Sequence, residues 1–167
     1  MEQSETEADD RPLWLHEMAH HVEHLRQPGS VGLIVGDRPA GLALLEELGR
    51  VLSTPPTSIT QIGLEHTPAR SERELRSRLS GHPLLYDLEA LFWVAWLRID
   101  PVRYLHHHAR KSGVIALWPG RVSGNVATFS NLGRRDHLRT ELSDLSVLRP
   151  LPTRFPDDVP FEIERIP

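Results

Sequence analysis

The stretch Ser30–Leu48, SVGLIVGDRPAGLALLEEL, decides the fold of this 167-residue chain. Its first part, Val31–Val35, is apolar and mostly β-branched, as in a strand buried inside a parallel sheet. The segment Gly36–Gly41 supplies a turn, and leucines then recur at the spacing of a helix. We therefore predict a buried strand, a tight loop, and an amphipathic helix that ends near Ser53.

Two glycines in this stretch have the spacing of a phosphate-binding loop, but the residues that follow them differ from that motif. Gly36 and Gly41 are placed as in the P-loop of nucleotide-binding proteins. A P-loop continues with a Lys that reaches the β- and γ-phosphates and a Ser or Thr that ligates Mg²⁺. This chain has Leu42 and Ala43 at those positions. From the local sequence alone, an ordinary strand–turn–helix explains the two glycines equally well.

Composition and charge bound the class of protein. Hydrophobic residues make up 39% and charged residues 25% of the chain, as in a globular domain. The longest apolar run, Leu88–Leu97, contains Glu89 and is shorter than a membrane span, so we expect no membrane partner. Disulfides and thiolate metal sites are excluded because the chain has no Cys. A cytoplasmic location is the default expectation. The net charge is −4, so the chain lacks the overall positive charge that is typical of nucleic-acid-binding proteins.

The order of predicted elements indicates a single α/β domain. We predict this domain over residues 11–150, with a disordered acidic tail at 1–10 and a Pro-rich tail at 151–167. Besides the central stretch, the predicted helices are 12–27, 71–79 and 101–111, and the predicted strands are 58–64, 83–88, 114–118, 122–130 and 146–151. This alternation argues for a mostly parallel open sheet with helices on both faces.

A second feature of nucleotide-binding domains follows about 50 residues after the glycine loop. The segment Leu84–Asp87 is an apolar strand that ends in a carboxylate, and Glu89 lies two residues further on. This is the form of a Walker-B element, whose acidic residues hold Mg²⁺. A buried strand that ends at a solvated Asp is the plain alternative. We expect Gly36–Gly41, Asp87 and Trp118 at the carboxyl ends of the strands, where ligands of such sheets bind.

Histidines suggest a different chemistry. His16, Glu17 and His20 form a literal H-E-x-x-H on the first predicted helix, in which two His can bind Zn²⁺ and the Glu can act as a general base. The alternative is a His-rich helix face turned to solvent or a partner. The side chains of His106, His107 and His108 cannot all bind the same metal ion, because consecutive helix residues point about 100° apart.

A basic patch lies near the end of the predicted domain. It consists of Arg134, Arg135 and Arg139 together with His137, and it can contact phosphate, nucleic acid or an acidic partner, or simply face solvent. The chain has no Cys, no G-x-S-x-G motif and no other recognisable nucleophile.

In order and spacing, several of these segments resemble a known family. They are the glycine loop after a strand, the segment LLYDLEALF from Leu84, the segment RIDP from Arg98, and VIALWPG from Val114. Together with Thr128 and the arginines near 134, they are similar to BrxF, the small P-loop protein of BREX phage-defence systems. The resemblance covers about residues 31–139.

The resemblance implies a P-loop ATPase-like fold and a role beside the BREX components that modify host DNA and block phage replication. Gly36 and Gly41 carry over as loop glycines and Glu89 as the acidic residue after the third strand, whereas Leu42 and Ala43 replace the functional Lys and hydroxyl. Within the loop, Asp37 would repel phosphate and Arg38 would offset that repulsion.

We therefore expect a non-catalytic accessory or assembly subunit, with other defence proteins as partners and at most weak binding of ATP and Mg²⁺. Homo-oligomerisation and contact with nucleic acid stay open. One alternative is an NTPase completed in trans by a partner. A second is a zinc-dependent hydrolase built on the H-E-x-x-H helix.

Overall fold

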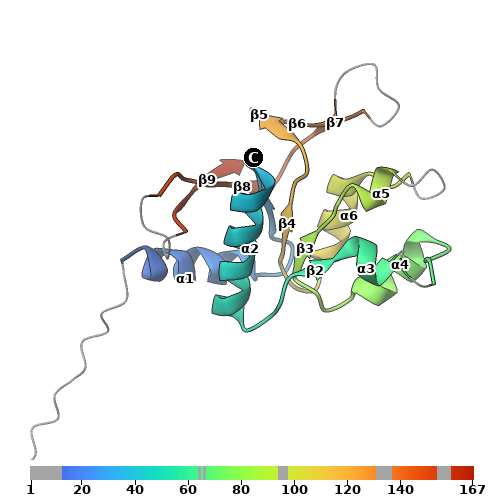
Figure 1. Cartoon of the computed structure of the whole chain (residues 1–167), viewed down its shortest axis with the longest axis horizontal. Helices are drawn as coiled ribbons and strands as arrows, with labels where there is room; N and C mark the ends of the chain where they lie inside the picture. The colour runs from blue at the N-terminus through green and yellow to red at the C-terminus, as the bar shows by residue number, and fades with distance from the viewer. Residues whose placement is uncertain (1–12, 64, 66, 94–97, 131–136, 154–158) are drawn as a thin grey trace, which may run out of the picture.

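A six-stranded sheet with helices on both faces forms the body of the molecule (Figure 1). The structure is a computed structural model, and it describes residues 13–63, 65, 67–93, 98–130, 137–153 and 159–167. The strands of this sheet lie in the order β2-β3-β4-β1-β8-β9. They are β1 (Val31–Ile34), β2 (Thr57–Ser58), β3 (Leu84–Tyr86), β4 (Val114–Leu117), β8 (Leu145–Pro150) and β9 (Phe161–Ile166). The predicted mixed α/β class with a mostly parallel sheet is confirmed.

The strand of the central stretch, β1, lies in the middle of the sheet. It pairs in parallel with β4 on one side and with β8 on the other. All four of its residues are buried, which explains why it is apolar throughout rather than alternating. A strand covered on both faces and both edges is the most constrained position in such a sheet, so its carboxyl end is a fixed point for a site.

Helices cover both faces of the sheet. On one face, α1 (Leu13–Leu25) and α2 (Arg38–Leu52) pack against Ile34, Ile115 and Leu148. The packing residues are Met18, Val22 and Leu25 of α1 and Leu44, Leu45 and Leu48 of α2. On the other face lie the remaining four helices. They are α3 (Ile59–Gly63), α4 (Glu72–Leu79), α5 (Ala90–Trp93) and α6 (Pro101–His108). The chain therefore leaves β1 over one face and leaves β3 over the opposite face.

The helix after β1 begins earlier than predicted. We expected a turn through Gly41, but α2 begins at Arg38, so only residues 35–37 separate it from the strand. Asp37 causes this early start, because its side chain accepts a hydrogen bond from the backbone N–H of Ala40 at 3.2 Å and caps the helix. Gly41 is consequently a residue of the first helical turn and not part of a loop.

Residues 58–64, which we predicted as a strand, are mostly helical. Only Thr57 and Ser58 pair with β3, and α3 begins directly afterwards. The Ser58 hydroxyl accepts a hydrogen bond from the backbone N–H of Gln61, as an N-cap does. This local bond, together with the three-residue spacing of Ile59 and Ile62, favours the helical turn over an extended segment.

A small antiparallel sheet projects beyond the carboxyl end of β4. It consists of β5 (Arg121–Ser123), β6 (Val126–Phe129) and β7 (Leu138–Glu141). The segment 122–130, which we predicted as one strand, is thus largely a hairpin that turns at Gly124, whose φ is +55°. In Figure 1 this sheet lies above the body of the molecule.

The last strand extends the domain beyond its predicted boundary. β9 runs antiparallel to β8 along its whole length, from Leu145 opposite Ile166 to Pro150 opposite Phe161. Residues 161–166, predicted to belong to a C-terminal tail, therefore form an edge of the main sheet. The tail predicted at residues 1–10 lies outside the described residues. Within the described residues, none of the helices is long and apolar enough to cross a membrane.

Candidate functional site

The carboxyl ends of the parallel strands bring together the residues that the sequence singled out. Gly36 and Asp37 follow β1, Asp87 and Glu89 follow β3, and Trp118 follows β4. Parallel pairing of β1 with β4 and of β4 with β3 places these three ends at one edge. Because the chain leaves β1 and β3 over opposite faces, a crevice opens here, and ligands of open α/β sheets bind at such points.

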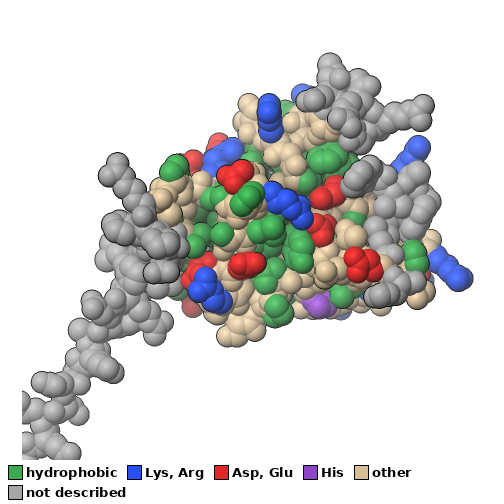
Figure 2. Space-filling view, viewed as in Figure 1, with side chains coloured by type: hydrophobic (Ala, Val, Ile, Leu, Met, Phe, Trp, Pro, Cys, Tyr) green, Lys and Arg blue, Asp and Glu red, His purple; other side chains and the backbone are tan. Residues whose placement is uncertain are grey.

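An ion pair fills the centre of this edge. The Arg38 guanidinium lies 2.7 Å from Asp87 Oδ1 and 3.7 Å from Glu89 Oε1. The hydrogen bond to Asp87 is the main reason why the pKa of Arg38 is raised above its ordinary value. Near the N-terminal end of α2, Figure 2 shows basic and acidic side chains next to each other rather than a patch of one sign. The two predicted Walker-B-like carboxylates thus already face a cation from their own chain.

Asp87 is held in place from two further directions. Its Oδ2 accepts a short hydrogen bond from the Ser58 hydroxyl at the end of β2. Its backbone has a φ of +61°, in the left-handed region, which Asp tolerates better than most residues. The carboxylate is therefore fixed by Ser58 on one oxygen and by Arg38 on the other. Neither of these partners was predicted from the sequence, since both pairings join segments far apart in the chain.

The glycine positions of the predicted phosphate loop have a packing role. A Cβ on Gly41 would overlap the Leu117 side chain, so this glycine lets α2 approach β4 closely. A Cβ on Gly36 would come no closer than 3.4 Å to Pro150, which is an ordinary contact. Leu42 packs partly against the core and Ala43 is exposed, and neither side chain can donate a hydrogen bond to phosphate.

The Trp118-Pro119-Gly120 segment connects the two sheets. Trp118 is fully buried, and its indole N–H donates a hydrogen bond to the Thr128 carbonyl at 3.1 Å. A Cβ on Gly120 would collide with the same carbonyl, so only glycine permits this close approach. Phe92 lies against both Trp118 and Phe129. These contacts fix the β5–β6 hairpin over the carboxyl end of β4.

Two cavities lie beside β1 at this edge. The smaller has a volume of about 140 Å³, between Arg38, Glu89 and Trp118. Glu89 Oε2 is buried and has no hydrogen-bond partner among the described residues. The larger, about 730 Å³, lies between β1, β8 and the β5–β6 hairpin. Its volume falls within the range of small-molecule sites.

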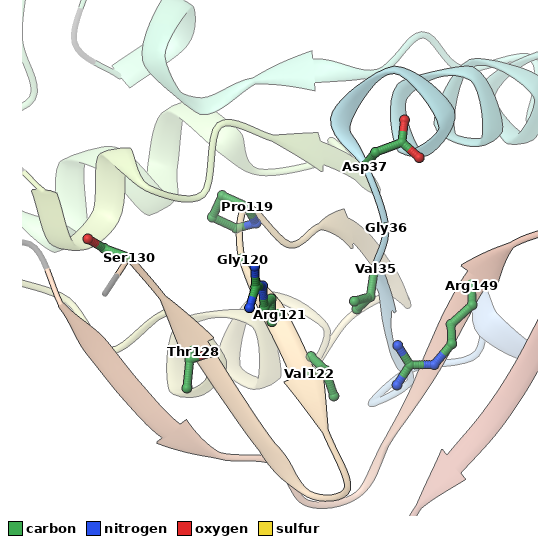
Figure 3. A pocket seen from close by; sticks show the side chains of 10 residues that line it. All are labelled: Val35, Gly36, Asp37, Pro119, Gly120, Arg121, Val122, Thr128, Ser130 and Arg149. Carbon is green, nitrogen blue, oxygen red and sulfur yellow. The ribbon is translucent and has the colours of Figure 1, made fainter. Parts of the chain in front are cut away.

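Two arginines line the larger cavity (Figure 3). The Arg149 guanidinium points into the space between β1 and the hairpin, whereas the Asp37 carboxylate points away from it. Arg149 is 3.6 Å from Glu164 of β9. No local motif marks Arg121 or Arg149 as site residues, because their neighbours in the cavity come from strand pairing between distant segments.

The other predicted site residues lie elsewhere. Arg139 is exposed on β7, whereas Arg134 and Arg135 lie outside the described residues. His20 is exposed on α1, and the side chains of His16 and Glu17 lie outside the described part of the structure. Within the described part, no group of three or more metal-ligating side chains occurs.

The three consecutive histidines diverge, as their spacing predicts. His106 Nε2 is 3.0 Å from the Ser143 carbonyl, and His108 Nε2 is 2.9 Å from the His82 carbonyl. His107 is exposed between them.

Comparisons with family models, with curated proteins and with solved structures find no match to this chain.

Proposed function

We propose that this chain is a non-catalytic, P-loop-like domain that acts as an accessory or assembly subunit. The observation that carries the proposal is the Arg38 guanidinium between Asp87 and Glu89. In P-loop enzymes, acidic residues at this edge hold Mg²⁺ against the phosphates. In this chain, the Arg38 guanidinium pairs with Asp87 and Glu89 instead.

Electrostatics supports the loss of catalysis. Two unit charges about 4 Å apart interact by about 4 kcal/mol near a protein surface, so Mg²⁺ beside Asp87 would meet strong repulsion from Arg38. The lysine that contacts the β- and γ-phosphates is replaced by Leu42. Together these changes remove most of the electrostatic stabilisation on which phosphoryl transfer depends.

Weak nucleotide binding remains compatible with this proposal. The start of α2 keeps the backbone N–H of Arg38, of the kind that holds anions at helix N-termini, whereas Pro39 has no N–H and that of Gly41 donates to the Asp37 carbonyl at 2.9 Å. However, Asp37 already accepts the Ala40 N–H, and its negative charge disfavours a phosphate there. We infer binding of ATP that is weak and not followed by turnover.

The resemblance to BrxF extends the proposal to a biological setting. We propose that the partners are other proteins of a BREX-type antiviral defence system in the cytoplasm. The surface between the β5–β6 hairpin and the carboxyl end of β1 is a candidate contact site for such an assembly. The same surface could also join copies of this chain. Light scattering of the purified chain measures its molar mass in solution and so distinguishes homo-oligomerisation from binding to other proteins.

One observation favours an alternative, an NTPase completed in trans. Glu89 Oε2 has no hydrogen-bond partner among the residues that the structure describes, and Glu89 lines a small cavity beside Trp118, where a carboxylate can orient a water molecule. A partner would then have to supply the missing cation.

Hydrolysis of ATP in the presence of Mg²⁺ tests both proposals, with the chain alone and with candidate partner proteins. The matched control is Glu89→Gln, which keeps the shape of the side chain and removes its charge. The accessory role predicts co-purification with a partner and no turnover that depends on Glu89. Turnover by the complex that disappears in Glu89→Gln would establish the trans-completed NTPase instead.

A further inference from the structure

A second candidate site lies at the opposite edge of the sheet, on the face covered by α4 and α6. It is a groove of about 1010 Å³ between α4, the last turn of α6 and the segments that lead into β3 and β4. We call it the α4–α6 groove and define it by Arg73, Arg76, His107, His108, Arg110 and Lys111. None of the residues that line it belongs to the cavities beside β1.

The groove is strongly basic in a chain whose net charge is −4. Four of its lining residues are Arg or Lys, and Glu72 is the only acidic residue among them. Glu72 pairs with Arg76, which also lies over the ring of the buried Tyr104. Arg73, Arg110 and Lys111 are exposed, and within the described part of the chain no ion pair involves them. We call Arg73, Arg110 and Lys111 the outer cations of the groove, and their side chains can contact a ligand.

The helix dipoles do not cancel this charge. Both helices end at the groove, and each C-terminus contributes about half a negative charge. That total of about one charge is smaller than the excess of the four cations over Glu72. The groove therefore stays positive.

The lining residues indicate what kind of anion fits. They contain no aliphatic side chain and no Phe, Tyr or Trp, whereas the core of a protein interface is apolar and rich in these large aromatics. Ser77, Ser80 and Ser112 add hydroxyl groups, which with Arg and Lys are the usual partners of nucleic-acid phosphates. The lining thus lacks the large aromatic rings on which single-strand-binding proteins stack successive bases. Since α4 has eight residues and is about 12 Å long, the groove can contact about three phosphates.

We propose that the α4–α6 groove binds the sugar–phosphate backbone of nucleic acid without reading the base sequence. This site is independent of the proposed non-catalytic role of the edge beside β1. Its failure or success in a binding experiment leaves the question of ATP turnover untouched.

The pKa values of two histidines that line the groove respond to its positive charge. Burial is the main cause that lowers the pKa of the half-buried His108. Loss of hydration beside the protein surface is the first cause that lowers the pKa of the exposed His107, and the nearby Arg76 lowers the pKa of both histidines further. A phosphate that enters the groove would oppose this and raise the pKa of His107. The histidine ring signals in NMR spectra therefore distinguish binding in the groove from binding elsewhere.

The test is fluorescence anisotropy of the full chain with a labelled DNA duplex of mixed sequence and with the matching single strand. The variant Arg110→Glu/Lys111→Glu removes two of the outer cations. The control Arg26→Glu/Arg103→Glu changes two exposed arginines outside the groove and shifts the net charge by the same amount. Circular dichroism establishes that both variants are folded.

The proposal predicts binding at low salt that weakens at least about tenfold in the groove variant and less than about twofold in the control. The slope of log K against log salt for the duplex should be about −2.7 in the wild type and about two units shallower in the groove variant. Absence of binding, equal loss in both variants, or tighter binding of a poly-glutamate peptide of equal charge than of DNA would each overturn the assignment to nucleic acid.

Discussion

Arg38 and Asp87, which lie 49 positions apart in the chain, meet at the carboxyl edge of the sheet with 2.7 Å between the guanidinium Nη2 and Oδ1. The contact links the first turn of α2 to the end of β3, across the crevice where a nucleotide would bind in a P-loop enzyme. Arg38 is about half exposed and Asp87 is largely buried. The pair therefore stabilises the fold and neutralises the site at the same time.

A double-mutant cycle measures this pair. We expect Arg38→Met and Asp87→Asn to show a coupling free energy of about 1 kcal/mol, because one partner is exposed and the pair is partly screened. Asn suits the left-handed backbone of position 87, so the cycle isolates charge from strain. Urea unfolding of the four proteins gives the value. A coupling of zero would mean that the two side chains do not interact in solution.

The two glycines of the apparent P-loop should behave differently. Gly41→Ala should destabilise the protein by about 1–2 kcal/mol, because overlap with Leu117 outweighs the gain in helix propensity. Gly36→Ala should be close to neutral, since its Cβ would make only an ordinary contact with Pro150. Thermal unfolding of both variants tests this. Equal destabilisation by the two substitutions would contradict the packing role that we assign to Gly41.

The contact between Gly120 and the Thr128 carbonyl should be essential for the second sheet. Gly120→Ala places a methyl group against backbone that cannot move without breaking the Trp118–Thr128 hydrogen bond, and we expect a loss of about 3 kcal/mol or more. Gly124→Asn at the hairpin turn serves as the control, because Asn tolerates a positive φ and the space there is open. Tryptophan fluorescence during chemical denaturation follows both variants.

His108 should make the stability of the fold depend on pH. Burial is the main cause that lowers the pKa of this histidine, and its Nε2–H donates to the His82 carbonyl in the neutral form. Because the unfolded chain binds the proton more readily, stability is lost as pH falls through the unfolded value of about 6.5. His108→Gln should lose less stability than the wild type between pH 7.5 and 5.5. The variant His20→Gln, at an exposed position, should follow the wild type.

The sequence predicts the core of the fold well where burial and local pattern agree. The apolar segments at 31–35, 84–86 and 114–118 form neighbouring parallel strands, as their composition indicates. The position of Asp87 and Trp118 at the carboxyl edge follows from that arrangement. The glycine spacing predicts a loop through Gly41, but capping by Asp37 starts the helix at Arg38, so Gly41 lies inside α2.

Non-local pairings could not be predicted. Arg38 with Asp87, Arg149 in the larger cavity, and β9 on the edge of the sheet all depend on contacts between segments far apart in the chain. The histidines of α6 and the basic residues of α4 form one groove only because these two helices lie side by side on the sheet. No periodicity or spacing within either segment contains that information.

Isothermal titration calorimetry of the purified chain with ATP and Mg²⁺ tests the central claim most directly. If Arg38 has taken the place of the metal, the wild type should bind ATP at most weakly, and Mg²⁺ should not tighten the binding. Mg²⁺-dependent binding with a dissociation constant in the low micromolar range or below would contradict this account, because it would show that Asp87 and Glu89 still hold a metal ion in the presence of Arg38.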